Sequence, residues 1–511
     1  MTGIRRTIRS AFPPEFGDHL AILAGTGQNI AGLAVFVAAT LGTNILVSRV
    51  LGGAAALGVV TLATQLAFVG GAATRFGMDM AAVRGVAIDV GRGEPGRVRS
   101  LVRRAAAMAA GVSAVVAVGV FLGAGGLARS LSGTAGAFRA AALALPFVAL
   151  CQVYLGGTRG LKIMRHTLYV YWAGQPVLWI LFLGVAWAVS KSVNASVVAY
   201  ALSWAVATAA AWLLWTRATA GFVPSPAGRG EVGALIRYGA PRAPAALLAQ
   251  LLFWTDYFVF SHYAQAKALG VYAAAVRVAQ ALVLFLIAVN YMFSPFVADL
   301  HARGERRRLD GLYKALTRWV VAGTLPILLL LVIVPGPVLK VFGGGFQSGS
   351  GALRILVIGQ AVNVATGSVG FILIMVGRTG WDLVVYACSF LLDLLVAILL
   401  VPHLHAGGAA IAQSITLAVS NGARLYLVWR FVHIQPFNRH YARLGIPAAA
   451  GGLAMLVVHL GLRQGAWPVD LLGSGLAGMA VYLPILLLAG LTPTERAAIG
   501  RVMRLRRSAA Q

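Results

Sequence analysis

Runs of about 20 apolar residues recur along the whole chain, and no other feature constrains its fold as strongly. Hydrophobic residues make up 59% of the 511 positions and charged residues only 11%. In a soluble domain, about a quarter of the residues would be charged. The runs are also too long and too uniform for the alternating strands of a membrane barrel. We therefore predict an all-α polytopic membrane protein.

The apolar runs predict about 14 transmembrane helices, most of them joined by short loops. The predicted spans cover roughly residues 23–48, 55–75, 105–127, 136–158, 168–189, 195–216, 239–261, 268–297, 317–336, 352–376, 382–402, 407–431, 443–462 and 470–490.

The basic residues predict the orientation of these spans. The formal net charge is +28, and Lys and Arg gather in the loops after even-numbered spans, most densely at 303–314. Loops rich in Lys and Arg face the cytoplasm, so both termini are predicted to be cytoplasmic. The basic N-terminal segment is interpreted as a retained cytoplasmic segment rather than a signal peptide. The same charge gives no reason to expect nucleic acid as a partner.

An internal repeat divides the chain. Ala56–Val60 reads ALGVV and Ala268–Tyr272 reads ALGVY, at an offset of about 212 residues. Two lobes of six spans related by pseudo-two-fold symmetry are therefore predicted, followed by two extra C-terminal helices. The predicted boundaries are 1–220 for the N-terminal lobe, 221–230 for a cytoplasmic linker, 231–435 for the C-terminal lobe, and 436–511 for the last two spans and a basic tail.

Two ionisable residues lie deep inside the first two spans of the second lobe. Arg277 follows the predicted turn by about 10 residues, which places it roughly 15 Å into the membrane, and Asp256 lies in the preceding span. The repeat aligns Asp256 with Asn44 and Arg277 with Gln65. A charge at this depth is expected to face the bundle interior or a watery cavity. Hydrogen bonding between helices is the alternative role, above all for Asn44 and Gln65.

Further charged residues lie near the cytoplasmic ends of the spans. Arg75, Asp79 and Arg84 end the second span, and Arg242 begins the seventh. Arg75 and Asp79 are four residues apart and could pair on one helix face. Together with Arg277, these arginines predict a cationic substrate-binding cavity suited to phosphate oxygens. Anchoring at the lipid headgroups is the alternative role for each of them.

Three carboxylates are candidates for coupling to an ion: Asp256, Asp79 and Asp393, the last in the middle of the eleventh span. A capped structural role is the alternative for Asp393. The chain has no P-loop, no nucleotide fingerprint and no His/Cys cluster at metal spacing. We therefore predict a protein that is not an enzyme, without catalytic residues, metal or cofactor, and we do not expect transport powered by its own ATP hydrolysis.

Several stretches together resemble the polysaccharide transporter family, the O-antigen or exopolysaccharide flippases of the multidrug/oligosaccharidyl-lipid/polysaccharide exporter superfamily. Their order and spacing carry the resemblance, which covers nearly the whole chain. The stretches are Ser48–Arg84, Asp256-Tyr257 with ALGVYAAAVRVAQAL and FSPFVADLHARGE, and VGRTG at Val376–Gly380 followed by Asp393, Val401-Pro402 and Gly407–Ala410.

The resemblance implies two lobes in a V around a central cavity, in the bacterial inner membrane. It implies flipping of a polyprenyl-pyrophosphate-linked oligosaccharide, driven by a proton gradient, a sodium gradient or the membrane potential. Membrane lipids, a glycan polymerase and glycosyltransferases are the candidate partners. A peptidoglycan-precursor flippase and a cation-coupled multidrug exporter of the same superfamily are the alternatives. Two positions depart from the pattern: Ala397 replaces a residue that is often polar in this family, and 24–48 lacks the carboxylate usual in drug exporters.

Overall fold

The computed structural model describes residues 34–91, 94–223, 242–252 and 254–490, together with positions 32, 233 and 235–237. Across these residues the chain is helical and contains no strand. Nine of the described helices are long and apolar enough to cross a membrane. A tenth span results if the bent helix pair Phe346–Thr366 and Val369–Met375 is counted as one span. The predicted all-α polytopic fold is confirmed, whereas the number of 14 spans is not.

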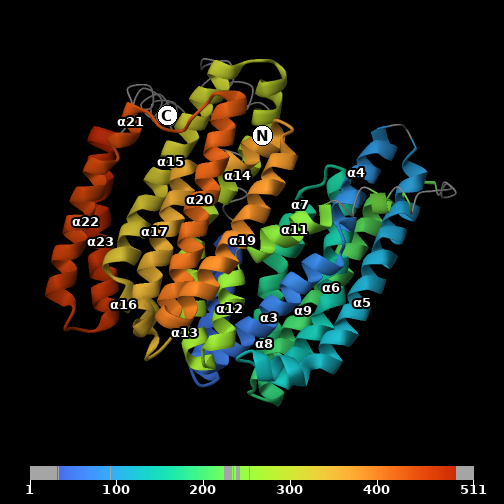
Figure 1. Ribbon diagram of the computed structural model, residues 1–511, viewed down its shortest axis with the longest axis horizontal. Helices are drawn as coiled ribbons and strands as arrows, with labels where there is room; N and C mark the ends of the chain where they lie inside the picture. The colour runs from blue at the N-terminus through green and yellow to red at the C-terminus, as the bar shows by residue number, and fades with distance from the viewer. Residues whose placement is uncertain are drawn as a thin grey trace, which may run out of the picture.

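The N-terminal lobe (Figure 1) begins with an apolar helix at Ala34–Val50. It continues with α3 (Ala54–Thr74), α4 (Met78–Gly91), α5 (Val98–Ser130), α6 (Ala135–Gly160), α7 (Arg165–Thr167), the π-helix η2 (Leu168–Gly174), α8 (Gln175–Val189) and α9 (Val193–Ala218).

The C-terminal lobe consists of α11 (Arg242–Leu251), α12 (Thr255–Tyr263), α13 (Ala266–Ala281), α14 (Leu284–Ala302), α15 (Arg306–Ile333), α16 (Pro335–Lys340), α17 (Ser350–Thr366), α18 (Val369–Met375), α19 (Thr379–Leu404) and α20 (Ala406–Val432). Then come the short α21 (Arg439–Ala442) and the two additional helices α22 (Gly445–Leu462) and α23 (Trp467–Ile485). In Figure 1, α22 and α23 lie on the outer side of the C-terminal lobe, away from the N-terminal lobe, where they contact α15.

Three predicted spans are each interrupted. The seventh is divided between α11 and α12, the eighth between α13 and α14, and the tenth between α17 and α18. The last of these breaks bends the chain by 43° at Gly367, which has a φ of 68°. A left-handed backbone of this kind favours glycine, which explains why the helix ends at this residue.

The two lobes share one hydrophobic core at one end of the molecule and have separate cores at the other. The shared core combines residues of α3, α6 and α9 with residues of α12, α13 and α17. Toward the other end, one cluster is built around α14 and α15 and another around α4 and α5. Leu235 packs in the α4–α5 cluster, although the prediction assigned it to the C-terminal lobe. Among the described residues, the core shared by both lobes therefore lies at one end of the molecule, and we call this end the lobe junction.

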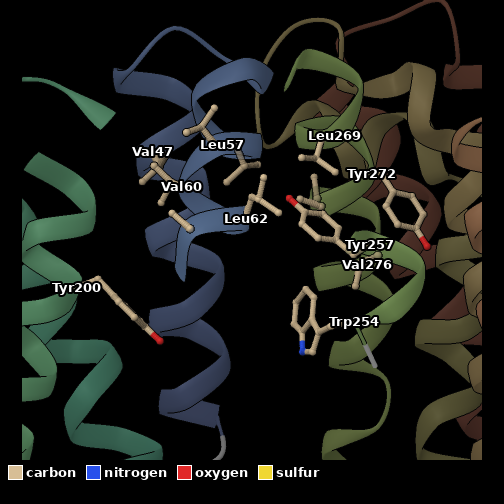
Figure 2. Packing of buried hydrophobic residues seen from close by; sticks show 14 of the residues in the cluster. Val47, Leu57, Val60, Leu62, Tyr200, Trp254, Tyr257, Leu269, Tyr272 and Val276 are labelled. Carbon is tan, nitrogen blue, oxygen red and sulfur yellow. The ribbon is translucent and has the colours of Figure 1, made fainter. Parts of the chain in front are cut away.

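The internal repeat lies at the lobe junction. A Cβ atom on Gly270 would be 1.6 Å from the carbonyl oxygen of Ala54, and one on Gly58 would be 2.3 Å from that of Ala266. Both pairs are related by the repeat, so each helix presents its glycine to the backbone of the other. Figure 2 shows Leu57 of α3 and Leu269 of α13 on the facing sides of these helices. Glycine permits this approach because it has no side chain.

Reciprocal hydrogen bonds surround this glycine contact. The Ser48 hydroxyl donates to the Phe342 carbonyl oxygen at 2.7 Å, and Arg49 Nη2 donates to that of Lys340 at 2.9 Å. On the other side, His262 Nδ1 lies 2.8 Å from the Ser130 carbonyl oxygen. Each lobe thus uses the end of one helix, 34–50 or α12, to contact the other lobe at or just after the end of α16 or α5. Under the predicted orientation, the lobe junction faces the periplasm.

The terminal segments 1–31 and 491–511 lie outside the described residues, as does most of the predicted linker at 221–230.

Candidate functional site

Arg277 lies on α13 in the region that joins the lobes, with its side chain partly buried. Its guanidinium is 4.9 Å from the centre of the Trp254 ring, so the flat cation lies over an aromatic face. No carboxylate of the described residues forms an ion pair with Arg277, and its Nε is buried without a hydrogen-bond partner. Its charge is therefore not neutralised by a neighbouring acid.

Phenol groups from both lobes surround this arginine. Arg277 interacts electrostatically with Tyr257 of α12 and with Tyr200 of α9 in the N-terminal lobe. Tyr257 is fully buried and donates a hydrogen bond of 3.2 Å to the Gly58 carbonyl oxygen of α3. Figure 2 shows Tyr257 and Trp254 on the side of the C-terminal lobe that faces α3. Arg277 is thus placed where a movement of the lobes would change its surroundings.

Asp256 and Asp393 meet inside the C-terminal lobe, although 137 positions separate them in the sequence. Both are fully buried, and the two carboxylates interact electrostatically. Asp256 accepts a hydrogen bond from the Tyr272 hydroxyl, and Asp393 accepts one of 3.3 Å from the Thr416 hydroxyl. One oxygen of each carboxylate, Oδ1 of Asp256 and Oδ2 of Asp393, is buried without a hydrogen-bond partner.

Two neighbouring carboxylates in a low-dielectric interior need a positive charge to compensate them. The two unpaired carboxylate oxygens and the hydroxyl oxygen of Tyr272 or Thr416 are hard ligands. A proton or a small hard cation would suit such ligands. The described residues contain no group of three or more His, Cys, Asp or Glu side chains at metal-binding distance. A bound cation would therefore be held by the two carboxylates and neighbouring hydroxyls, and not by three or more acidic, thiol or imidazole ligands.

The repeat partners of these residues form different contacts. Asn44 is buried and donates a hydrogen bond of 2.6 Å to the Thr40 carbonyl oxygen, one turn earlier in its own helix. Gln65 is buried within α3. Asn44 thus forms a contact within its helix, and in the N-terminal lobe no carboxylate occupies the position of Asp256.

The cytoplasmic group predicted from the sequence is only partly brought together. Arg75 and Asp79 pair at 3.5 Å across the break between α3 and α4, where Asp79 is buried in the first turn of α4. Arg84 lies exposed on α4. Arg242 begins α11, and its side chain lies outside the described residues.

Sequence reasoning missed a second buried charge pair. Arg424 of α20 and Asp382 of α19 form an ion pair of 3.0 Å inside the C-terminal lobe, and both are buried. Spacing was the available signal, because Asp382, Tyr386, Ser389 and Asp393 are separated by four, three and four residues. That spacing places them on one face of a helix.

The fold and this site define a class of protein: a two-lobed helical membrane protein with charged groups enclosed between and within its lobes. The MatE family model matches residues 30–185 and 241–399 of the chain, more than half of its length. The chain therefore belongs to the MatE family. It is a membrane transporter with a MATE domain.

Solved structures share the fold at low sequence identity. The lipid II flippase MurJ in an inward closed conformation is similar with a TM-score of 0.69 and 12% identity, over 90% of this chain and 98% of MurJ. An inward-facing multidrug resistance MATE transporter gives a TM-score of 0.64 and 14% identity, over 78% of this chain and 94% of that one. A comparison with curated proteins finds no match.

Proposed function

We propose that this protein flips a polyprenyl-pyrophosphate-linked oligosaccharide across the bacterial inner membrane, for assembly of lipopolysaccharide or exopolysaccharide. Both termini lie on the cytoplasmic side, where the substrate is loaded. Glycosyltransferases act on the glycan before this step, and a glycan polymerase acts on it afterwards. Membrane lipids surround the path of the polyprenyl tail.

Arg277 is the observation that carries this proposal. A guanidinium that is largely removed from water and has no acidic partner is costly, so such groups are expected to have a function. An anionic substrate between the lobes would supply the missing counter-charge. Arginine suits pyrophosphate in particular, because its planar fork of N–H donors matches phosphate oxygens.

The arrangement of the lobes supports transport by alternating access. The lobes share a core at the junction and have separate cores at the other end. Loading from the cytoplasm fits this arrangement under the predicted orientation. Release into the periplasm then requires the contacts around Gly58 and Gly270 to separate while the opposite end closes.

The two additional helices favour a lipid-linked substrate over a drug. The likeness to the MurJ structure covers 90% of this chain, whereas that to the multidrug transporter covers 78%. Helices α22 and α23 lie on the outer side of the C-terminal lobe (Figure 1), where a groove for a polyprenyl tail would be open to the bilayer. The MurJ neighbour is a lipid II flippase, which makes a peptidoglycan lipid precursor the second candidate, since its pyrophosphate would use Arg277 in the same way.

The carboxylate pair provides the coupling to an ion gradient. We assign the coupling cation, a proton or sodium, to Asp256 and Asp393. The pair lies in the same lobe as Arg277 and is linked to α13 through the hydrogen bond from Tyr272. Occupation of the pair can therefore alter the position of α13, the helix that carries Arg277 and half of the lobe junction.

Depletion of the protein in its host tests the proposed function. Lipid-linked repeat units should accumulate on the cytoplasmic side, and their exposure in the periplasm should fall, in cells that have no second transporter for them. Periplasmic exposure of the glycan at the normal rate would contradict the proposal. Accumulation of peptidoglycan precursors in place of repeat units would select the second candidate.

Arginine variants test the site. Arg277→Ala should lower flipping at least tenfold, and Arg277→Lys should keep more activity because it retains the positive charge. Lys267→Ala, on the same helix but exposed, is the matched control and should flip at the normal rate. Equal loss in both Arg277 variants, or loss of the protein from the membrane, would show that Arg277 is structural.

A further inference from the structure

Two polar stripes face each other along α19 and α20. The buried face of α19 carries Asp382, Ser389 and Asp393, with Tyr386 beside them. The buried face of α20 carries Thr416, Ser420 and Arg424 at intervals of one helical turn. At 1.5 Å per residue, the 11 positions from Asp382 to Asp393 span roughly 16 Å.

The outward faces of the same helices are apolar. Leu391 of α19 is 61% exposed and Val419 of α20 is 52% exposed, as expected for side chains that contact lipid. Polar residues are therefore confined to the seam between the two helices. Serine and threonine in membrane helices often bond to their own backbone, but Thr416 donates to Asp393 and Ser420 accepts from Arg424.

The seam connects the buried carboxylate pair with the end of the lobe remote from the junction. Thr416 contacts Asp393, one member of the pair. Arg424 and Asp382 lie at the other end, close to Arg378 and Trp381, which are exposed. This is the end that the predicted orientation places at the cytoplasm.

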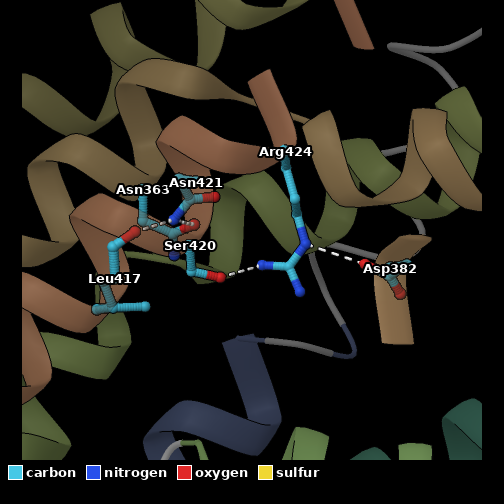
Figure 3. Close-up of polar contacts among 6 residues, drawn as sticks. All are labelled: Asn363, Asp382, Leu417, Ser420, Asn421 and Arg424. Carbon is cyan, nitrogen blue, oxygen red and sulfur yellow. Dashed lines mark hydrogen bonds and ion pairs between the residues drawn. The ribbon is translucent and has the colours of Figure 1, made fainter. Parts of the chain in front are cut away.

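Arg424 closes this end of the seam. Its Nε donates to Asp382 at 3.0 Å, and its Nη1 donates to the Ser420 hydroxyl at 2.5 Å. Figure 3 shows the guanidinium held between these two contacts. The Tyr386 ring lies on one side, with its centre 4.4 Å from the guanidinium carbon. The Nη2 group is buried and has no hydrogen-bond partner.

A fixed positive charge in a narrow polar path repels cations, as arginines do in other selective pores. Asp382 holds the guanidinium in place as its counterion, so the arrangement is stable without a cation, and a cation that passes Arg424 would have to displace this ion pair. Beyond Arg424, the next ionisable group on the buried face of α19 is Asp393. The seam thus has a carboxylate pair at its inner end and a closed ion pair at its outer end.

We propose that the seam between α19 and α20 is the path by which the coupling cation reaches Asp256 and Asp393 from the cytoplasm, with Arg424 as its barrier. This inference rests on the proposed role of the carboxylate pair.

Thiol accessibility tests the path directly. Both cysteines, Cys151 and Cys388, are free and are first replaced by alanine. Ser389→Cys then reports on the seam and Leu391→Cys on the lipid face of the same helix. The probe is 2-aminoethyl methanethiosulfonate, a small cation, added to the cytoplasmic side of inside-out vesicles. We expect Arg424→Gln to raise the reaction rate at Ser389→Cys at least tenfold and to leave Leu391→Cys unchanged.

Cation uptake into proteoliposomes gives an independent readout. With sodium-22 or a proton pulse and no organic substrate, Arg424→Gln should raise the uptake at least fivefold over the wild type. Arg354→Gln is the control, because Arg354 is exposed on α17. Asp382→Asn alone leaves a buried arginine without its counterion, so it can also impair folding. The double variant Arg424→Gln/Asp382→Asn avoids this and should behave like Arg424→Gln.

The outcomes separate this inference from the proposed function. If Asp256→Asn and Asp393→Asn lower cation uptake while Arg424→Gln and the double variant change neither uptake nor thiol reactivity, the barrier is overturned. If uptake is the same in all variants, including the carboxylate ones, the proposed coupling site itself is overturned.

Discussion

The two lobes share a backbone plan and differ in the chemistry of their interiors. The C-terminal lobe encloses Asp256, Asp393, Asp382 and Arg424. In the N-terminal lobe, the helices that correspond to α19 and α20 carry aromatic rings instead. The ring centres of Trp179 and Tyr200 are 4.9 Å apart, and those of Tyr171 and Trp204 are 5.7 Å apart.

This difference shows which features the repeat retains. The glycines at the lobe junction occur in both copies, because each helix must approach the backbone of the other. The buried carboxylate pair of Asp256 and Asp393 occurs in one copy only among the described residues, although the N-terminal lobe buries Asp79 beside Arg75. A second cation site would add the desolvation cost of further buried carboxylates without a requirement from the fold. The lobes therefore divide their roles: both build the junction, and the C-terminal lobe handles the ion.

The largest effect is expected from the feature that the lobes share. In Gly270→Ala, the new Cβ would overlap the Ala54 carbonyl oxygen, and a backbone atom cannot rotate away as a side chain can. Overpacking of this kind costs about 1–3 kcal/mol, enough to shift a two-state equilibrium at least several-fold. We expect the lobes to separate at the junction and transport to be nearly abolished.

Spin labels on exposed turns of the two lobes, at Gly52 and Gly344 in a cysteine-free background, would report this separation by electron resonance. Gly111→Ala, on α5 with open space around it, is the control. A distance between the labels that is the same in Gly270→Ala and in the wild type would contradict the account of the junction.

The next effect concerns the feature that distinguishes the lobes. Asp256→Asn and Asp393→Asn should each lower gradient-driven transport about tenfold, because the cation loses half of its site. Asn44→Asp introduces a carboxylate at the repeat position of Asp256, but it should not create a second coupling site, since no second carboxylate faces it. Transport is measured with and without an imposed proton or sodium gradient. An unchanged gradient dependence in Asp393→Asn would remove that residue from the ion path.

The smallest effect comes from exchanging side chains between the lobes. Arg277→Gln combined with Gln65→Arg moves the positive charge to the repeat position in α3. If the substrate needs mainly a positive charge between the lobes, the double variant should recover about threefold in flipping over Arg277→Gln alone. No recovery would mean that the geometry around Trp254 and Tyr257 is required as well, and the two lobes would then differ in substrate binding too.

The sequence predicted the class of fold well, because hydropathy and charge asymmetry depend only on local composition. It also predicted the repeat, whose ALGV motif marks the helices that meet at Gly58 and Gly270. The breaks between α11 and α12 and between α13 and α14 were not predicted. These breaks fall inside continuous apolar runs and not at prolines, so the hydropathy pattern does not reveal them.

The candidate site was predicted in part. The sequence identified Arg277, Asp256 and Asp393 as candidates because a charge inside an apolar span is costly to bury, whichever helices the span packs against. Their partners depend on packing between distant helices, so the meeting of Asp256 with Asp393 was not foreseen. Arg424 was missed because it lies in the last third of its span, where an arginine is usually interpreted as a headgroup anchor.

Translocation by the purified protein tests the central claim most directly. A fluorescent polyprenyl-pyrophosphate disaccharide is placed in proteoliposomes, and its appearance in the opposite leaflet is followed by chemical quenching. The monophosphate analogue is the comparison. We predict that the wild type translocates the pyrophosphate at least tenfold faster than the monophosphate, and that Arg277→Ala abolishes this preference. Equal rates for both lipids in the wild type, or a preference that persists in Arg277→Ala, would contradict the assignment of Arg277 to the pyrophosphate.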